Sequence, residues 1–124
     1  MRLATYGTLG PGKPNHHHVS MIEGTWTTGT VRGFLHEEGW GAAHGFPGIL
    51  LDSAGPLVSV DLLESDALGG HLERLDRFEG PGYQRVLANV ETANGVVQAF
   101  IYELALSAEA RAEVLNKTDK QAHA

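Results

Sequence analysis

The 124-residue chain contains no cysteine. Disulfide bonds, thiolate nucleophiles and thiolate metal sites are therefore excluded. Long apolar runs are also missing: the first residues lack the core of a signal peptide, and no stretch approaches the roughly 18 apolar residues of a membrane span. These absences predict a soluble, cytoplasmic protein with no membrane partner.

Positive charge is scarce, because 9 Lys and Arg residues stand against 15 Asp and Glu residues, for a net charge of −6. Binding to nucleic acid depends on clustered Lys and Arg, so no nucleic-acid partner is expected. Glycine, in contrast, is plentiful, with 16 residues. Such a content indicates a flexible chain or many backbone positions that tolerate no β-carbon. Because 42% of the residues are hydrophobic, we expect a folded single domain over residues 1–124.

Most of the chain reads as short strands punctuated by glycine. Runs rich in β-branched and aromatic residues predict strands at residues 3–6, 25–35, 49–51, 57–63, 83–91 and 96–104. A bulge is expected in the second strand at Gly29 or Gly33. Asn94-Gly95 predicts a hairpin turn between the last two strands.

Two segments favour helices. Residues 65–78 can be capped by Ser65 or Asp66, and the sequence Gly80-Pro81-Gly82 ends the helix. A second helix is expected over residues 107–115, with Ser107 as its N-cap. The polar residues 118–124 are expected to form a frayed tail.

The helical period places a carboxyl group on an apolar face. Leu68, Leu72 and Leu75 form a stripe, and at 100° per residue Glu79 falls in the middle of that stripe. A buried glutamate is either paired with a cation or has a raised pKa, and the second state suits a general base near pH 7. Two alternatives stay open: Glu79 turns outwards at a fraying helix end, or Arg85 pairs with it and lowers its pKa.

Residues 6–10, Tyr-Gly-Thr-Leu-Gly, continue the first strand into a glycine-containing turn. Successive backbone N–H groups in such a turn can form an anion-binding nest, and Gly7 lets a ligand approach the main chain closely. The same residues would equally serve a plain turn. The Gly-Lys-Ser/Thr ending of a P-loop is missing.

The run His16-His17-His18 invites a metal site. Adjacent side chains diverge on a helix and alternate across a strand, so at most two of the three could face one ion. No His-Glu-x-x-His spacing occurs, and no Gly-x-Ser-x-Gly motif supports a nucleophile elbow. We interpret the run as a polar loop that buries one histidine at most, and expect no metal and no cofactor.

Three ordered motifs between residues 3 and 104 carry a family resemblance. They are Tyr6-Gly7-Thr8-Leu9 followed by Gly12-Lys13-Pro14-Asn15-His16, then Leu75-Asp76-Arg77-Phe78-Glu79-Gly80, then Tyr83-Gln84-Arg85-Val86. In order and separation the set resembles the γ-glutamyl cyclotransferase-like superfamily, and within it the compact branch that includes γ-glutamylamine cyclotransferases. The sequence departs from the pattern at Gly10-Pro11, where relatives often carry a basic pair.

The resemblance implies an α+β fold, a small mixed-strand β-barrel with flanking short helices and an active-site cavity. It implies release of 5-oxoproline and an amine from a small-molecule γ-glutamyl amide by attack of the substrate's α-amine. Glu79 would be the general acid/base, and the loop of Tyr6, Gly7, Thr8 and Leu9 would bind the α-carboxylate. Two further aromatic side chains, Tyr83 and Tyr102, would line the pocket.

Other functions remain open on the same residues. One is a non-catalytic module that binds a small carboxylate, and another is a different amide-processing reaction in the same pocket. Glu79 favours an enzyme, because a carboxylate binder gains nothing from a second buried anion. Gly39, Gly41 and Gly45, around Trp40 and His44, suggest a mobile loop over the cavity mouth.

Overall fold

The computed structural model describes residues 1–36 and 48–122, with side chains as far as residue 116. The glycine-rich loop expected around Trp40 and His44 lies outside these residues. Within them the chain forms six strands: β1 (Arg2–Thr5), β2 (Thr25–His36), β3 (Gly48–Leu51), β4 (Leu57–Glu64), β5 (Tyr83–Thr92) and β6 (Gly95–Leu104). Each coincides with a predicted strand to within one residue at either end.

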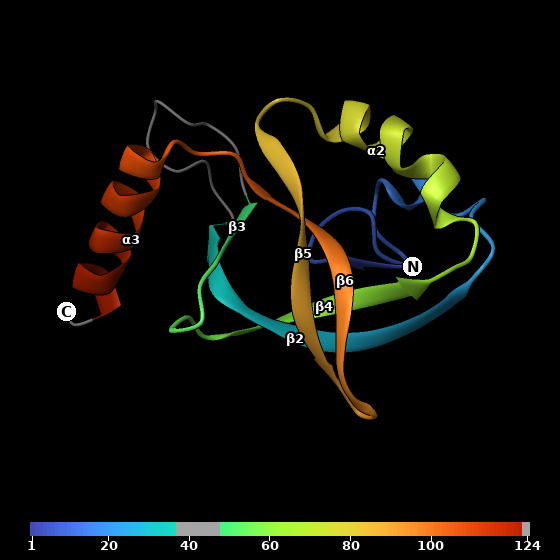
Figure 1. Ribbon diagram of the computed structural model, residues 1–124, viewed down its shortest axis with the longest axis horizontal. Helices are drawn as coiled ribbons and strands as arrows, with labels where there is room; N and C mark the ends of the chain where they lie inside the picture. Colours follow the sequence, from blue (N-terminus) through green and yellow to red (C-terminus); the bar gives the residue numbers. More distant parts are fainter. Residues whose placement is uncertain (37–47, 123–124) are drawn as a thin grey trace.

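Five of these strands close into a barrel in the order β1-β4-β2-β3-β6, with β6 returning to β1 (Figure 1). Pairing is antiparallel except for β1 with β6 and β3 with β6, which are parallel. Strand β5 lies outside the ring, paired along its length with β6 and touching β2 at Thr30 and Glu91. The predicted α+β fold with a mixed-strand barrel is confirmed.

The first helix is shorter than predicted. A 3-10 turn at Leu68–His71 precedes α2 (Leu72–Glu79), and no side chain caps the start of either. The predicted cap by Ser65 or Asp66 is therefore wrong, because the Ser65 hydroxyl accepts instead from the amide of Ala67, ahead of the turn, at 3.0 Å. Gly69 and Gly70 account for the delayed start, since each glycine costs a helix interior about 1 kcal/mol relative to alanine. The helix ends as predicted at Gly80, whose φ of 79° suits a C-cap glycine.

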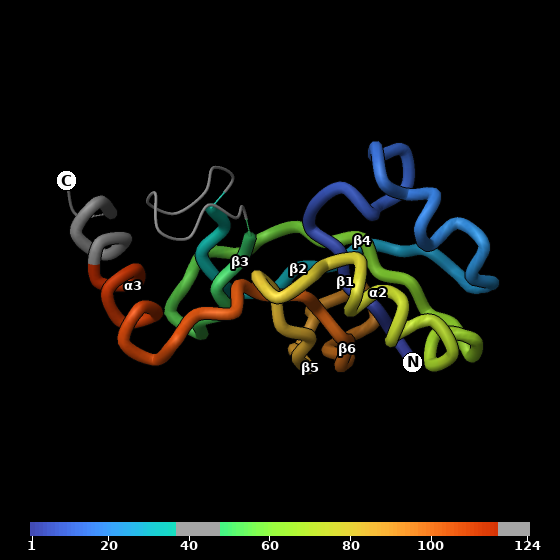
Figure 2. The backbone as a smooth tube through the Cα atoms, turned by 90° about the horizontal axis from the view of Figure 1, so that it is seen from above, coloured from blue at the N-terminus to red at the C-terminus, as the bar shows by residue number. Residues whose placement is uncertain are grey.

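Helix α3 (Ala108–Ala122) begins as predicted, with the Ser107 hydroxyl accepting from the amide of Ala110 at 3.1 Å. It continues past residue 115, so the expected tail is helical as far as Ala122. Figures 1 and 2 place α3 at one end of the molecule, and α2 with the segment that follows β1 at the other. Neither these helices nor any other described one is long and apolar enough to cross a membrane.

The core has separate parts inside and outside the barrel. Val31, Ile49 and Ile101 are among the side chains that fill the interior. The stripe of Leu68, Leu72 and Leu75 is buried with Leu3 and Leu63 between α2 and the outer face of the barrel. This packing fixes the rotation of α2 and hence the direction in which the last residue of the helix points.

The glycines of β2 do not form the predicted bulge. Pairing with β4 is unbroken from Thr25 to Arg32, and at Gly33 the strand pairs with β3 instead. A β-carbon at Gly29 would lie 2.8 Å from the carbonyl oxygen of Glu91, and one at Gly33 would lie 2.7 Å from that of Leu50. Glycine is therefore required because neighbouring backbones approach closely where the barrel curves.

The hairpin between β5 and β6 forms at the expected place. Thr92 pairs with Gly95 across a two-residue loop, and Gly95 has a φ of 109° that other residues rarely adopt. The β5–β6 ribbon extends beyond the barrel in Figure 1. Its other end, next to α2, contributes two side chains to the cavity described below.

Candidate functional site

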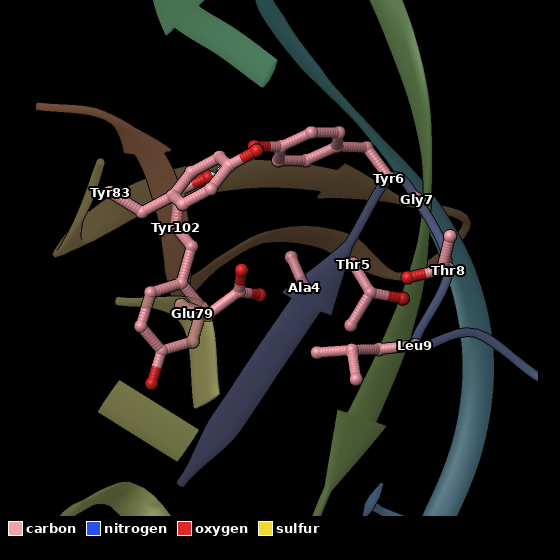
Figure 3. Close-up of a pocket in the computed structure, with 9 residues that line it drawn as sticks. All are labelled: Ala4, Thr5, Tyr6, Gly7, Thr8, Leu9, Glu79, Tyr83 and Tyr102. Carbon is pink, nitrogen blue, oxygen red and sulfur yellow. Dashed lines mark hydrogen bonds between the residues drawn. The ribbon is translucent and has the colours of Figure 1, made fainter. Parts of the chain in front are cut away.

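A cavity of about 140 Å³ lies between α2, the start of β5 and the loop after β1. Nine residues line it: Ala4, Thr5, Tyr6, Gly7, Thr8, Leu9, Glu79, Tyr83 and Tyr102 (Figure 3). All seven residues expected at the γ-glutamyl site line this one cavity, although they come from four separate segments. Ala4 and Thr5 were not predicted.

Glu79 is the last residue of α2 and turns its carboxyl into the cavity (Figure 3). Burial raises the pKa of this carboxyl to about 7, and among the described residues no hydrogen bond or opposite charge offsets that effect. The alternative in which Glu79 turns outwards is therefore wrong. A half-buried carboxyl that titrates near pH 7 can both take and return a proton under neutral conditions.

The alternative partner of Glu79, Arg85, is bound elsewhere. Its guanidinium pairs with Asp76, one turn earlier on α2, through Nε to Oδ1 at 2.9 Å and Nη2 to Oδ2 at 3.1 Å. The hydrogen bonds from Arg85 lower the pKa of Asp76. The sequence could not distinguish the two pairings, because both carboxyls belong to the same helix.

Three tyrosines surround the Glu79 carboxyl. The Tyr102 hydroxyl donates to Asp76 Oδ1 at 2.7 Å, so its ring lines the cavity while its oxygen points away (Figure 3). The Tyr6 hydroxyl donates to the backbone carbonyl of Tyr102. Burial raises the pKa of each of Tyr6, Tyr83 and Tyr102. All three therefore stay neutral at pH 7, and none of them supplies a charge to balance Glu79.

The loop after β1 is held by its carbonyl groups and its threonine side chain. The Asn15 amide donates to the Thr8 carbonyl at 2.9 Å, the Asn15 side chain donates to the Thr8 hydroxyl at 2.8 Å, and His16 Nδ1 lies 2.9 Å from the Leu9 carbonyl. No described acceptor takes the amide N–H groups of Gly7, Thr8 or Leu9. The turn thus offers unpaired donors beside the cavity, as an anion-binding nest does.

The histidine run forms a 3-10 turn, His16–His18, in which no side chain is fully buried. The His18 ring stacks on Phe78 of α2 with centroids 4.0 Å apart, and the His18 carbonyl accepts from Arg74 at 2.9 Å. The turn therefore ties the loop to the helix that carries Glu79. Over residues 1–36 and 48–116, no three histidine or acidic side chains converge as metal ligands would.

Thr5 lines the cavity but was not expected there from the sequence. Its side chain is 5% exposed, and its hydroxyl has no hydrogen-bond partner within the described structure. Buried hydroxyls are normally satisfied, so this one marks an unusual position next to the loop. A threonine in a strand is too common to be noticed in the sequence, and its missing partner is visible only in three dimensions.

Comparison with solved structures gives the same fold. YkqA from Bacillus subtilis is 25% identical with a TM-score of 0.65, and the match covers 86% of this chain but 36% of YkqA. An uncharacterized protein from Pyrococcus horikoshii is 26% identical (TM-score 0.61; 86% of this chain and 80% of that one). An AIG2-like protein from Mus musculus is 27% identical (TM-score 0.62; 87% and 80%).

No curated protein sequence matches the chain significantly. The family model described as "Gamma-glutamyl cyclotransferase, AIG2-like" matches residues 3–120, which is nearly the whole chain. The resemblance inferred from the three motifs is thereby confirmed. The chain belongs to the AIG2-like family of γ-glutamyl cyclotransferases.

Proposed function

We propose that the protein releases 5-oxoproline and an amine from a small γ-glutamyl amide, by attack of the substrate's own α-amine on its γ-carbonyl carbon. The observation that carries this proposal is an unpaired carboxyl, Glu79, with a pKa near 7, on the same cavity as the unpaired amides of residues 7–9. The carboxyl suits proton transfer, and the amides suit the α-carboxylate. Family membership supports the reaction type.

Glu79 would act as a proton carrier. As a carboxylate it takes a proton from the α-ammonium group, and the resulting amine forms the new N–C bond of the ring. As a carboxylic acid it returns that proton to the nitrogen of the amide, whose C–N bond breaks. The second proton of the ring nitrogen follows the same route to the released amine, and Glu79 ends as a carboxylate. The enzyme's remaining task is to hold the substrate in its cyclising conformation.

The size of the cavity limits what it can enclose. At about 140 Å³ it is small beside typical ligand pockets of roughly 300–1,000 Å³, so it suits a single γ-glutamyl group. A wider groove of about 590 Å³ shares Thr5, Tyr6 and Gly7 with it and is lined by polar residues including Lys13 and Asp61. A β-carbon at Gly7 would meet no atom within 4 Å, so this junction is open. We propose that the leaving amine extends into the groove past Gly7.

The test is an assay for 5-oxoproline with γ-glutamyl amino acids, γ-glutamyl amines, γ-glutamyl-lysine isopeptide and glutathione as substrates. Glu79→Gln should lower kcat by a factor of about 10² to 10⁴, the usual contribution of a general acid/base. Glu73→Gln is the matched control, because Glu73 lies on the same helix with its side chain 88% exposed. Equal rates for wild type and Glu79→Gln would remove Glu79 from the mechanism. Binding of these compounds without product from any of them would favour the carboxylate-binding module.

A further inference from the structure

We propose that Asp76 is a positioning residue that holds Arg85 and the Tyr102 hydroxyl outside the cavity, so that no cation reaches the Glu79 carboxyl. The inference rests on the proposed role of Glu79 as acid and base. It assigns a function to an ion pair that otherwise looks like a surface salt bridge, with side chains 42% (Asp76) and 27% (Arg85) exposed.

The arrangement follows from two periodicities. Asp76 and Glu79 are three residues apart on α2 and so occupy neighbouring turns of one face. Tyr83 and Arg85 are two residues apart on β5 and so point to the same side of the strand. The helix face meets the strand face: Asp76 pairs with Arg85, while Glu79 and Tyr83 line the cavity together. Arg85 is thus bound to the residue that lies one helical turn before Glu79.

Tyr102 lies between the ion pair and the cavity. Its ring lines the cavity, its hydroxyl is bound to Asp76, and Asp76, Arg85 and Glu79 all act electrostatically on that hydroxyl. Arg85 is also held by Phe100, whose ring centroid lies 4.9 Å from the guanidinium carbon. Two hydrogen bonds to a carboxylate and one aromatic contact therefore fix a long, flexible side chain on one side of the Tyr102 ring.

The titratable groups that face Glu79 explain why this matters. They are Tyr6 from the loop after β1, Tyr83 from β5 and Tyr102 from β6, all neutral at pH 7, and the charged groups one turn away are Asp76 and Arg85. A cation within about 4–6 Å lowers the pKa of a carboxyl by roughly 1–3 units. If Arg85 paired with Glu79, the carboxyl would remain an anion at neutral pH and would no longer return its proton.

The test is the titration of Glu79 in wild type, Asp76→Asn, Arg85→Met and the double variant. Protein labelled with ¹³C in its glutamate side chains is titrated by NMR, and Glu79→Gln assigns the signal. Asparagine keeps an acceptor for the Tyr102 hydroxyl, so Asp76→Asn chiefly releases Arg85. We expect the midpoint of Glu79 to fall by about 1–3 pH units in Asp76→Asn, and to return to near 7 in the double variant.

Rescue by the second substitution separates positioning from general damage, because a merely structural role of Asp76 would not be restored by removing Arg85. An unchanged midpoint in Asp76→Asn, or an equal fall in the double variant, would overturn the inference. Arg85→Met provides a check that does not need Asp76→Asn to fold: a shift of more than one pH unit would mean that Arg85 already acts on Glu79. The titration requires no turnover, so a failure of the proposed reaction would be seen separately, as absence of 5-oxoproline.

Discussion

Two partly or fully buried glutamates, Glu103 on β6 and Glu79 on α2, have contrasting hydrogen-bond partners. Glu103, near the end of β6, is 7% exposed and receives hydrogen bonds from the amide of Leu51 at 3.2 Å, from Gln84 Nε2 at 3.0 Å and from Arg111 at 3.4 Å. Glu79 lines the cavity together with Tyr102, the residue before Glu103, and receives none within the described structure. Burial alone therefore does not define the role of a carboxyl group.

The partners decide what each glutamate can do. Those of Glu103 come from β3, β5 and α3, so this carboxylate joins the C-terminal helix to the barrel. Buried charges that are fully hydrogen-bonded stabilise a particular arrangement of elements. A buried carboxylate without partners destabilises the fold. The same unfavourable energy raises the pKa of the carboxyl group, so that it exchanges protons near neutral pH. Reactivity at Glu79 and anchoring at Glu103 thus follow from the presence or absence of donors.

The largest expected effect concerns the pH dependence of the proposed reaction. Burial raises the pKa of Glu79 to about 7, and the free enzyme needs the carboxylate to accept the first proton. The carboxylate fraction is about one half at pH 7 and about one hundredth at pH 5, so kcat/KM should fall about 50-fold between these pH values. Steady-state kinetics across this range measure the effect, with Glu73→Gln as a control that keeps the same profile. A profile that is flat down to pH 5 would contradict the contrast between the two glutamates.

Arg111→Met tests the anchoring role of Glu103, because it removes the guanidinium that pairs with this carboxylate. The substitution leaves Glu103 buried without its cation, which should lower the free energy of unfolding by roughly 2–3 kcal/mol. This is less than for a fully buried pair, because the Arg111 side chain is 32% exposed. Urea denaturation measures the loss. The Glu79 midpoint in the NMR titration should stay in place, and movement by a whole pH unit would mean that the two regions are coupled.

Glu79→Gln should lower activity but raise the free energy of unfolding, and the gain in stability should grow with pH. The unfolded carboxyl titrates near 4.5 and the folded one near 7, so the folded wild type binds more protons between these values and loses stability as pH rises. The variant should equal wild type at pH 4.5 and exceed it by about 1–2 kcal/mol at pH 8, after allowance for solvent screening. Urea denaturation at the two pH values tests this, and a less stable variant at pH 8 would be evidence against an unpaired carboxylate.

The smallest expected effect comes from Thr5→Val, which removes a buried, unpartnered side-chain hydroxyl on the cavity. Because the buried hydroxyl has no partner among the described residues, replacing it with a methyl group should stabilise the protein by about 1 kcal/mol. Thermal or urea unfolding measures the change, and Thr30→Val, on the partly exposed surface of β2, is a comparison within the same barrel. A loss of stability in Thr5→Val would show that the hydroxyl is satisfied.

Much of the fold could be predicted because its signals are local. The alternation of residues in the strands, the hairpin at Gly95 and the helix stop at Gly80 each depend on a few neighbouring positions. The predicted bulge at Gly29 or Gly33 was wrong. Glycine is needed there because the backbones of neighbouring strands, at Glu91 and Leu50, approach too closely for a β-carbon. Contacts between distant segments leave no periodic trace in the sequence.

The sequence by itself determined the leucine stripe with Glu79 in line with it, and the glycine-containing turn at residues 6–10. That Glu79 turns into the cavity and that the amides of residues 7–9 are unpaired became visible only in the fold. Only the tertiary structure decided that Arg85 belongs to Asp76 and that the Thr5 hydroxyl lacks a partner. The reason is physical: the facing direction of a side chain follows from the helix or strand period. A pKa, however, depends on every charge and donor within a few ångströms, and these come from all parts of the chain.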